Sequence, residues 1–396
     1  MGKKADTMKD ENSSPEARCG KVGRLRVLHL SVQRELTAGQ RQQLRCEAAV
    51  SKRLEGAQWE SIAYHTGVCQ EAFERPIAWP FRSLMLRKLY AWLVLLRCAR
   101  QHDVVLLRHI PFDPFAFIFA PFVSNRISVH HSKEEEEMRL IKPGLQGRIA
   151  SWLERRTGRF VTRRSAGILG MTHEIAEYEK VFHGATAPTG IFPNGIEPEE
   201  VPLVKDARDV RCVNAVFICG TFNAWHGLDL LVEAVAEAKV APDTLQIHLI
   251  GKLSEEQLQR INRLENSDCF RIHGYLKKDA YLKILELADV GIGSLAMGRQ
   301  NLTEGATLKV RELLAAGIPV YSGHYDTALP ERFPYYLVDH TVNIDRLLSF
   351  ATSARSTPRP IIREEALRLV SKEQAMRNVL RWIDETPSLR KLGAKG

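Results

Sequence analysis

The order of short apolar runs and longer amphipathic segments constrains the fold of this chain more than any other feature. Each run is rich in Val, Ile and Leu, ends near a glycine or a polar residue, and precedes a helical pattern or a loop. Buried strands of parallel sheets alternate with crossover helices in this way. We therefore expect an α/β protein with strands near residues 25–30, 104–107, 127–131, 166–172, 215–220, 245–250, 272–274, 289–292 and 317–320.

The strands fall into two series, which the turn-rich stretch 192–202 separates. Helical patterns cover residues 40–54, 84–100, 227–239 and 372–386. Two α/β domains of similar size are the simplest partition. We expect a disordered tail over residues 1–22, an N-terminal Rossmann-like domain over 23–197, a C-terminal Rossmann-like domain over 198–371, and a final helical segment over 372–396 that can pack back on the N-terminal domain.

Composition excludes several classes of protein. The chain has 396 residues, of which 44% are hydrophobic and 26% are charged, as in ordinary globular proteins. The longest apolar runs, 89–96 and 115–123, fall short of the ~18–20 residues that a membrane-spanning helix needs. Residues 1–26 lack the apolar core of a secretory signal. The seven cysteines are scattered and form no Cys-x-x-Cys pair, so we expect a reduced, cytoplasmic chain without a zinc site.

The positive charge of the chain lies in its first half. Residues 1–195 hold 30 basic and 20 acidic residues, whereas residues 196–396 hold 26 basic and 27 acidic residues. An anionic surface or substrate is therefore expected to meet the first domain. Nucleic acid is not expected as the partner, because no zinc-finger spacing, basic zipper or RNP-like motif occurs.

The stretch 294–320 carries the most informative chemistry. Glu304 and Glu312 are separated by seven residues, and a helix is expected to begin near Ala306 or Thr307. Free N–H groups at a helix start attract anions, and Lys309 adds a cation within the first turn. This pattern indicates a site for a diphosphate and for sugar or ribose hydroxyls. The alternative is a capped helix with two solvated glutamates.

Other segments support the first interpretation. They are Phe-Pro-Asn-Gly-Ile at 192–196, Gly-Thr-Phe-Asn-Ala-Trp-His-Gly-Leu at 220–228, His-Gly-Tyr at 273–275 and Ala-Ala-Gly-Ile-Pro-Val at 315–320. In this order, together with Glu-x7-Glu, they resemble the C-terminal half of the group-one, family-four type retaining glycosyltransferases, which have the GT-B fold. The resemblance is specific over residues 190–322 and looser over 24–190. It implies two Rossmann-like domains that face each other across a cleft.

The resemblance also implies roles for particular residues. Glu304 is expected to contact the transferred sugar, and Glu312 to accept hydrogen bonds from the ribose hydroxyls. The backbone amides of Gly305, Ala306 and Thr307 would hold sugar hydroxyls and diphosphate. The loop after the first C-terminal strand, formed by Gly220, Thr221 and Phe222, would meet the diphosphate together with Lys309. The turn of His273, Gly274 and Tyr275 would line the nucleobase.

Two expectations follow from the same family. The donor is a nucleoside-diphosphate sugar, which the enzyme would use without a cofactor or a divalent metal. The chain has no Asp-x-Asp motif, which argues against the metal-dependent GT-A alternative. The family usually carries an Arg and a Lys in the diphosphate loop, where this chain has Thr221 or Phe222 and then His226. His226 is thus expected either to contact phosphate or to pack on Trp225 at the helix start.

Candidate residues in the first half are fewer. His130 and His131 follow a strand at the edge where open α/β sheets bind ligands, and either could act beside the reacting sugar. Gly39 matches the position where the first loop of the family approaches the donor phosphate. The acidic run 134–137 is expected to be a solvated helix start.

The segment 81–92 combines aromatic and basic residues, and a dense run of phenylalanines follows at 112–122. Such segments suit an interfacial helix on anionic lipid at the inner face of the cell membrane, and they equally suit core helices with exposed arginine ends.

The sequence thus predicts a retaining hexosyltransferase of polysaccharide or cell-envelope biosynthesis that acts on a glycan or lipid-linked acceptor. A non-catalytic nucleotide-sugar-binding subunit and a nucleotide-sugar 2-epimerase of the same fold remain as alternatives.

Overall fold

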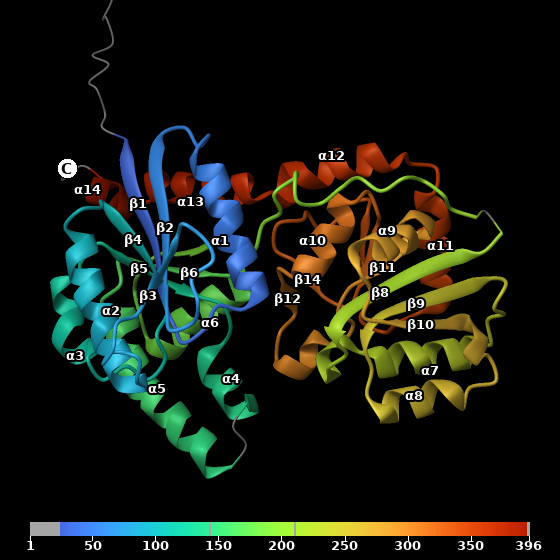
Figure 1. Ribbon diagram of the computed structural model, residues 1–396, viewed down its shortest axis with the longest axis horizontal. Helices are drawn as coiled ribbons and strands as arrows, with labels where there is room; N and C mark the ends of the chain where they lie inside the picture. The colour runs from blue at the N-terminus through green and yellow to red at the C-terminus, as the bar shows by residue number, and fades with distance from the viewer. Residues whose placement is uncertain (1–23, 142–143, 210, 394–396) are drawn as a thin grey trace, which may run out of the picture.

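The computed structural model describes residues 24–141, 144–209 and 211–393, so the tail expected over 1–22 lies outside the described residues. It contains two α/β domains, each built on its own parallel sheet (Figure 1). The prediction of an α/β fold with two parallel-sheet domains is confirmed.

The N-terminal sheet has seven strands in the order β3-β2-β1-β4-β5-β6-β7, and every neighbouring pair is parallel. Since β1 lies in the middle, the chain winds outward in both directions and helices cover both faces. The carboxyl ends of the strands therefore share one edge. The strands are β1 (Leu25–Val32), β2 (Ala57–His65), β3 (Glu74–Pro76), β4 (Val104–Arg108), β5 (Arg126–His130), β6 (Gly167–Gly170) and β7 (Thr189–Ile191).

Local sequence signals define the helices of this domain. A capping box of Thr37 and Gln40 begins α1, and the Thr172 side chain caps α6, which ends at Gly184 in the left-handed region. The helices are α1 (Ala38–Ser51), α2 (Leu84–Ala99), α3 (Ala116–Phe119), the 3₁₀ turn η1 (Ala120–Phe122), α4 (Glu134–Ile141), α5 (Leu145–Arg163) and α6 (His173–His183).

The C-terminal sheet has six parallel strands in the order β10-β9-β8-β11-β13-β15. A separate two-stranded ribbon, β12 with β14, projects from it. The strands are β8 (Val213–Thr221), β9 (Leu245–Lys252), β10 (Phe270–Gly274), β11 (Val290–Ile292), β12 (Glu304–Gly305), β13 (Val320–Ser322), β14 (Tyr325–Asp326) and β15 (Tyr336–Val338).

Two apolar cores pack on this sheet, and the helices that bury them alternate with the strands along the chain. These elements are η2 (Ala224–His226), α7 (Leu228–Ala238), α8 (Glu255–Asn262), η3 (Ser267–Cys269), α9 (Lys278–Leu287), η4 (Met297–Gln300), α10 (Leu308–Ala315), α11 (Ile344–Ala354) and α12 (Arg359–Val370).

The last two helices, α13 (Lys372–Glu385) and α14 (Pro387–Gly393), return to the N-terminal domain. Met376 and Val379 of α13 join the core formed by the N-terminal strands. The Trp382 ring lies against Gly167 and Gly190, where an added Cβ would come within 2.8 Å of it. The glycines of β6 and β7 therefore leave room for the indole of a helix that is distant in sequence.

The chain crosses between the domains twice, and the two crossings pair with each other. Ile196 and Ser371 form a parallel bridge, with Lys372 N–H donating to the Ile196 carbonyl. Gly195 lies so close to Lys372 that a Cβ there would sit 2.3 Å from the Lys372 Cα. The Gln43 side chain from α1 bonds both backbone groups of Gly195. The glycine of the Pro-Asn-Gly-Ile segment is thus required by this close crossing.

Several features differ from the sequence analysis. Strand β2 was not expected, although its apolar and polar residues alternate, because the prediction rests on continuous apolar runs; in the sheet it pairs with β1 over residues 57–64. The short strands β3, β7, β12, β14 and β15 were not expected either. The acidic run at the start of α4 is not solvated throughout, since Glu134 and Glu135 are buried. Among the described helices, none has the length and apolar character that crossing a bilayer requires.

Candidate active site

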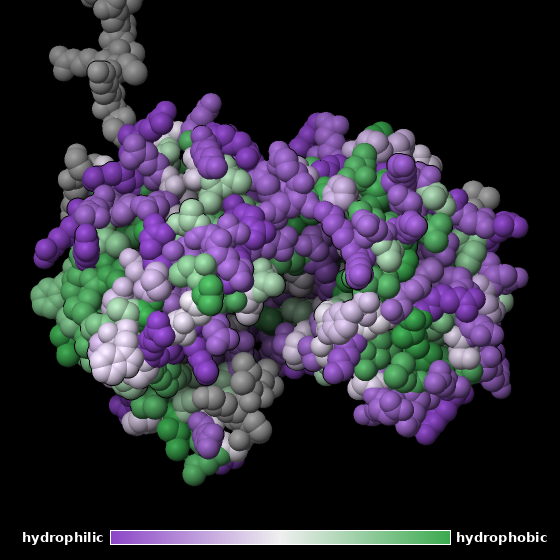
Figure 2. Space-filling model, in the orientation of Figure 1, coloured by the Kyte–Doolittle hydropathy of each residue, from purple (hydrophilic) through white to green (hydrophobic). Residues whose placement is uncertain are grey.

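A hollow separates the two domains on the face shown in Figure 2. Here the carboxyl edge of the N-terminal sheet faces the start of α10, and both sides line one cavity of about 290 Å³. The N-terminal side contributes His131 and Thr172, and the C-terminal side contributes Glu304 and the segment 305–307. The structure therefore brings the predicted sugar-contacting residues of both halves to one place.

The start of α10 is open toward this cavity. Thr307 is its N-cap residue, but the Thr307 side chain makes no capping hydrogen bond. Its Oγ1 is buried without a partner among the described residues. Gly305 lies directly over the ring of His324, which leaves 2.6 Å between that ring and the position of a Cβ. The N–H groups of the first turn have no acceptor within the helix, so this end of α10 suits an anion.

Buried contacts hold the loop before α10 in place. The Arg311 guanidinium forms a paired hydrogen bond with the Asp326 carboxylate, which ties α10 to β14. Arg311 also donates to the Asn194 carbonyl, and the Asn194 amide donates to the Ala306 carbonyl over 2.9 Å. The segment between the domains thereby positions the backbone that faces the cavity.

Glu304 lies where the two domains touch. Its Oε2 accepts a hydrogen bond from the Glu174 N–H at the start of α6, over 2.8 Å. In return, Glu174 accepts from the N–H groups of Thr303 and Glu304, and it pairs with Lys133 over 2.8 Å. Lys133 donates to the Asn301 carbonyl as well. This contact joins the two domains beside the cavity.

Lys309 forms the cationic centre of the C-terminal side. Its ammonium contacts the Cys219 thiol over 3.4 Å and lies 5.1 Å from the Phe217 ring centroid. It forms no ion pair with the described residues, and burial lowers its pKa. A buried cation without a carboxylate partner gains stability from an anionic ligand.

His226 stands next to this lysine. The Asn223 N–H donates to its Nδ1 over 2.9 Å, and its ring contacts Trp225. Burial and the charge of Lys309 lower the pKa of His226 to about 4. His226 is therefore neutral at pH 7, and its proton resides on Nε2, from which it can be donated.

The remaining donor candidates lie at the carboxyl edge of the C-terminal sheet. Gly220 and Thr221 are exposed at the end of β8, whereas Phe222 is buried in the core below them. His273 lies near the end of β10, where it stacks on His248 and bonds it over 3.0 Å. Gly274 ends the strand with a positive φ, and Tyr275 is 70% exposed. Since β9 lies between β8 and β10, these two groups are separated by two strand spacings, roughly 10 Å.

Glu312 and Gly39 meet the opposite domain. The Gln42 amide of α1 donates to Glu312 over 3.4 Å, and burial raises the pKa of Glu312. Gly39 packs against the Leu308 side chain of α10, and both residues line a second cavity of about 220 Å³. The first turn of α1 thus faces the first turn of α10.

The two adjacent histidines have different surroundings. His130 is fully buried, with Nδ1 bonded to Glu134, Nε2 bonded to the Ser128 hydroxyl, and its ring stacked on His109. His131 instead lines three adjoining cavities, and its Nε2 has no partner among the described residues. Burial and the Arg108 charge lower the pKa of His131, so it is neutral. The structure thus places His131 in the cleft and His130 behind it.

A buried polar network supports the strand that ends in these histidines. It contains three imidazoles and three carboxylates, which come from β5, α4, α5, α6 and the loop after β4. Burial raises the pKa of Glu134 to about 7, whereas the Glu154 carboxylate outweighs burial and raises the pKa of His109 to about 9. The members are His109, His130, Glu134, Glu154, Glu179 and His183.

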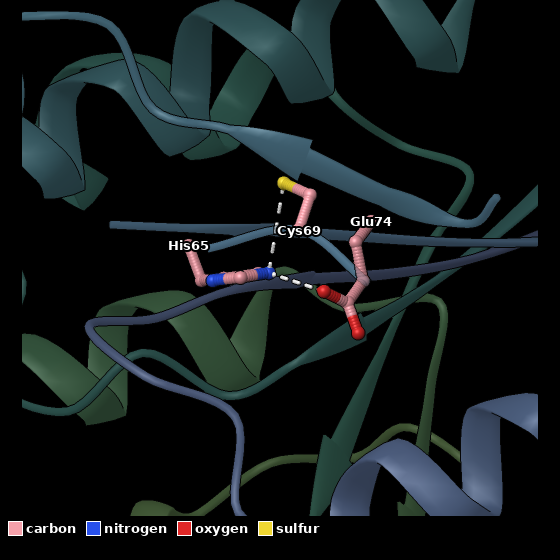
Figure 3. Close-up of side chains that lie close together, drawn as sticks. All are labelled: His65, Cys69 and Glu74. Carbon is pink, nitrogen blue, oxygen red and sulfur yellow. Dashed lines mark hydrogen bonds and ion pairs between the residues drawn. The ribbon is translucent and has the colours of Figure 1, made fainter. Parts of the chain in front are cut away.

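Two groups of described side chains have the composition of a metal site, and both lie in the N-terminal domain. One belongs to the network above. In the other, shown in Figure 3, the Cys69 thiol and the Glu74 carboxylate both lie beside Nε2 of His65. The Gly67 N–H donates to His65 Nδ1, so His65 carries its proton on Nε2 and donates it to Glu74. This hydrogen bonding is complete with protein groups, and these residues do not line the cavities of the cleft.

Sequence reasoning missed several residues of the cleft. Arg108 ends β4 at the ligand-binding edge of the sheet, a position that could have been found from the strand pattern. Glu174 and Lys133 gave no such signal, since their roles depend on contacts across the cleft.

Comparison with known proteins agrees with this geometry. Residues 213–341 match the family model described as "Glycosyl transferases group 1". The resemblance to the group-one glycosyltransferases is confirmed. The matched segment contains the loop after β8, Lys309 and the start of α10, so this family domain supplies the C-terminal side of the cleft. A comparison with curated protein sequences finds no match.

Solved structures with the GT-B fold superpose on nearly the whole chain. HepE from Anabaena, in complex with UDP and glucose, is 13% identical with a TM-score of 0.58 and covers 91% of this chain and 100% of its own. The lipopolysaccharide outer core galactosyltransferase WaaB is 11% identical with a TM-score of 0.60, and the match covers 90% of this chain and 99% of WaaB. Sucrose-phosphate synthase from Thermosynechococcus elongatus is 15% identical with a TM-score of 0.59, and the match covers 94% of this chain and 100% of the synthase chain. At these identities the comparison establishes the fold, which is GT-B.

Proposed function

We propose that the protein is a retaining hexosyltransferase that moves a sugar from a nucleoside-diphosphate sugar to a glycan or lipid-linked acceptor. The observation that carries the proposal is the cavity shared by His131 of one domain and Glu304 to Thr307 of the other. The family match of the C-terminal domain supports a nucleotide-sugar donor. HepE, whose fold this chain shares, has been crystallised with UDP and with UDP-glucose.

In the proposed reaction the bond between the anomeric carbon and the diphosphate oxygen breaks, and its electron pair stays on the diphosphate. A bond from the acceptor hydroxyl oxygen to the anomeric carbon forms, and the hydroxyl proton passes to the departing diphosphate or to water. Negative charge grows on the diphosphate, so groups already aimed at it lower the barrier. The start of α10, the Lys309 ammonium and the His226 Nε2–H are these groups. Retention is proposed from the family resemblance.

The same groups support a reaction without a divalent metal, because cationic and N–H donors meet the diphosphate directly. The test is a thermal-shift screen of the full chain with UDP-, GDP-, dTDP- and ADP-sugars in the presence of EDTA. A ligand at a hundredfold excess over Kd stabilises the folded state by about 2.7 kcal/mol. We expect a rise in Tm with one nucleotide class. No rise with any class contradicts the proposal. A rise in Tm without donor turnover favours the non-catalytic subunit, whereas donor turnover without net nucleotide release favours the epimerase.

We further propose that the acceptor is reached at an anionic membrane surface. Most of α2 is a core helix that buries Ala91, Trp92 and Leu95, but its first turn exposes Leu84, Met85 and Leu86 beside basic residues. Exposed apolar side chains next to arginines suit the lipid interface. Sedimentation with phosphatidylglycerol vesicles at low salt tests this. We expect binding that replacement of Met85 and Leu86 by serine weakens, and no binding by the wild-type chain contradicts it.

A further inference from the structure

A cationic cavity opens from the cleft into the N-terminal domain. Its volume is about 360 Å³, within the range of small-molecule sites. Three guanidinium groups line it from separate elements: Arg34 follows β1, Arg87 lies in the first turn of α2, and Arg108 ends β4. His131 lines both this cavity and the one that contains Glu304, so the two are adjacent.

Arg108 is the strongest sign that this cavity receives an anion. Its guanidinium is partly buried, and within the described part of the chain it forms no hydrogen bond or ion pair. Burial lowers its pKa, while Glu134 and Glu137, which also line the cavity, oppose that shift. Burial and the charge of Arg34 likewise lower the pKa of Arg87. Two arginines that repel each other and a third without a partner are stabilised together by a bound anion.

The wall of the cavity is firmly built. The buried Lys88 ammonium donates hydrogen bonds to the carbonyl groups of Pro111 and Phe112, over 2.6 and 2.8 Å. These bonds fix the backbone of the loop that forms the wall. Phe112 has a φ of 41°, an uncommon conformation for a residue with a side chain, and its N–H donates to the buried Glu154. The Trp92 indole bonds Asp113 at the end of the same loop. A strained backbone held by this many contacts is typical of a preformed site.

We propose that Arg34, Arg87 and Arg108 bind a phosphate or carboxylate group of the acceptor. This inference rests on the proposed glycosyl transfer and names the acceptor class: a molecule that carries an anionic group close to the hydroxyl to be glycosylated. With that group in the arginine cavity, the neighbouring hydroxyl lies beside His131, at the border with the cavity that holds Glu304. Bidentate guanidinium contacts favour planar carboxylates and phosphates over neutral sugars.

The test uses α-D-glucose 1-phosphate as the anionic probe and methyl α-D-glucoside as its neutral counterpart, both measured by isothermal titration with the full chain. The donor site is first saturated with the nucleoside diphosphate that the thermal-shift screen selects. Arg87→Gln and Arg108→Gln remove two cavity charges. Arg97→Gln makes the same change at an exposed position of the same helix, and Lys309→Ala alters the donor side.

We expect the phosphate probe, but not the neutral sugar, to bind beside the nucleotide. We expect its Kd to rise at least about tenfold in Arg87→Gln and Arg108→Gln, which is ~1.4 kcal/mol, and to stay unchanged in Arg97→Gln and Lys309→Ala. Equal affinity in all four variants overturns the inference. So does competition between the nucleotide and the probe, because the cavity then belongs to the donor. Failure of the wild-type chain to bind any nucleotide contradicts the proposed function instead, and probe binding is then measured without it.

Discussion

The two domains share one architecture but build their halves of the cleft differently. On the C-terminal side, the candidate groups are close in sequence: Glu304 and the backbone of 305–307 line the cavity, and Lys309 follows in the first turn of α10. On the N-terminal side, the corresponding groups follow separate strands, as Arg34, Arg108 and His131 show. A site made from one loop and one helix start can be found in a sequence. A site made from side chains at several strand ends depends on the order of the strands.

Charge is buried near the cleft in two ways. Lys309 is buried beside a thiol and an aromatic ring, without a carboxylate partner among the described residues. Behind His131, in contrast, imidazoles and carboxylates neutralise one another. Paired buried charges offset each other's cost of desolvation, whereas an unpaired one suits a ligand of opposite charge. The following predictions test this contrast.

Glu304→Gln is expected to have the largest effect on activity. The substitution keeps the shape of the side chain but removes the charge next to the proposed sugar site, and loss of one such electrostatic contact lowers kcat on the order of a hundredfold. Release of nucleoside diphosphate from the donor measures it. Glu331→Gln, at an exposed position of the same domain, is the control. If Glu304→Gln keeps wild-type turnover, the carboxylate does not act on the sugar.

Lys309→Ala is expected to lower donor turnover by more than about tenfold, or ~1.4 kcal/mol in activation free energy. The reason is that its ammonium has no acidic partner among the described residues and is proposed to meet the diphosphate instead. Steady-state kinetics of the variant, compared with Lys283→Ala on the exposed side of α9, measure the effect. Unchanged kinetics would remove Lys309 from the site.

Substitutions of the two adjacent histidines are expected to have different effects, one on turnover and the other on stability. His131→Asn is expected to lower turnover roughly tenfold, because one hydrogen bond to the sugar contributes about 1.4 kcal/mol, with little change in Tm. His130→Asn is expected to destabilise the fold by about 2–4 kcal/mol, because it leaves the buried Glu134 carboxyl without its partner. Thermal unfolding and turnover of both variants give the comparison. A destabilised His131→Asn with normal turnover would reverse the two roles.

The pH dependence of stability is expected to be the smallest effect. Because Glu154 raises the pKa of His109 to about 9, the folded chain binds this proton more tightly than the unfolded chain, where the pKa is about 6.5. The stabilisation is full below about pH 6.5 and is lost as the pH rises through 9. The Tm should therefore fall between pH 7 and 9.5, and less so in His109→Gln. His340→Gln, at an exposed histidine, should keep the wild-type slope.

The sequence predicted much of the local backbone on the C-terminal side of the cleft, since its motifs there describe turns and helix starts. The Gly-Thr-Phe segment ends β8, Gly305 and Thr307 precede α10, and the Pro-Asn-Gly-Ile segment forms the crossing between the domains. In the first half it predicted most strands, because buried parallel strands are continuous apolar runs. It missed β2, which is not a continuous apolar run because its apolar and polar residues alternate, and the short strands β3 and β7.

The sequence alone could not decide which of His130 and His131 faces the cleft. Successive residues of a strand point to opposite sides, but only the helices packed on each face decide which side is core and which is cleft. The burial of Glu134 and the exposure of the first turn of α2 were decided in the same way. The sequence by itself determined the two parallel sheets, the turn between them and the start of α10, because these depend on neighbours along the chain. The tertiary structure alone decided which side chains meet in the cleft, since Arg34, Arg87, Arg108 and His131 come together only when β1, β4 and β5 pair and α2 packs beside them.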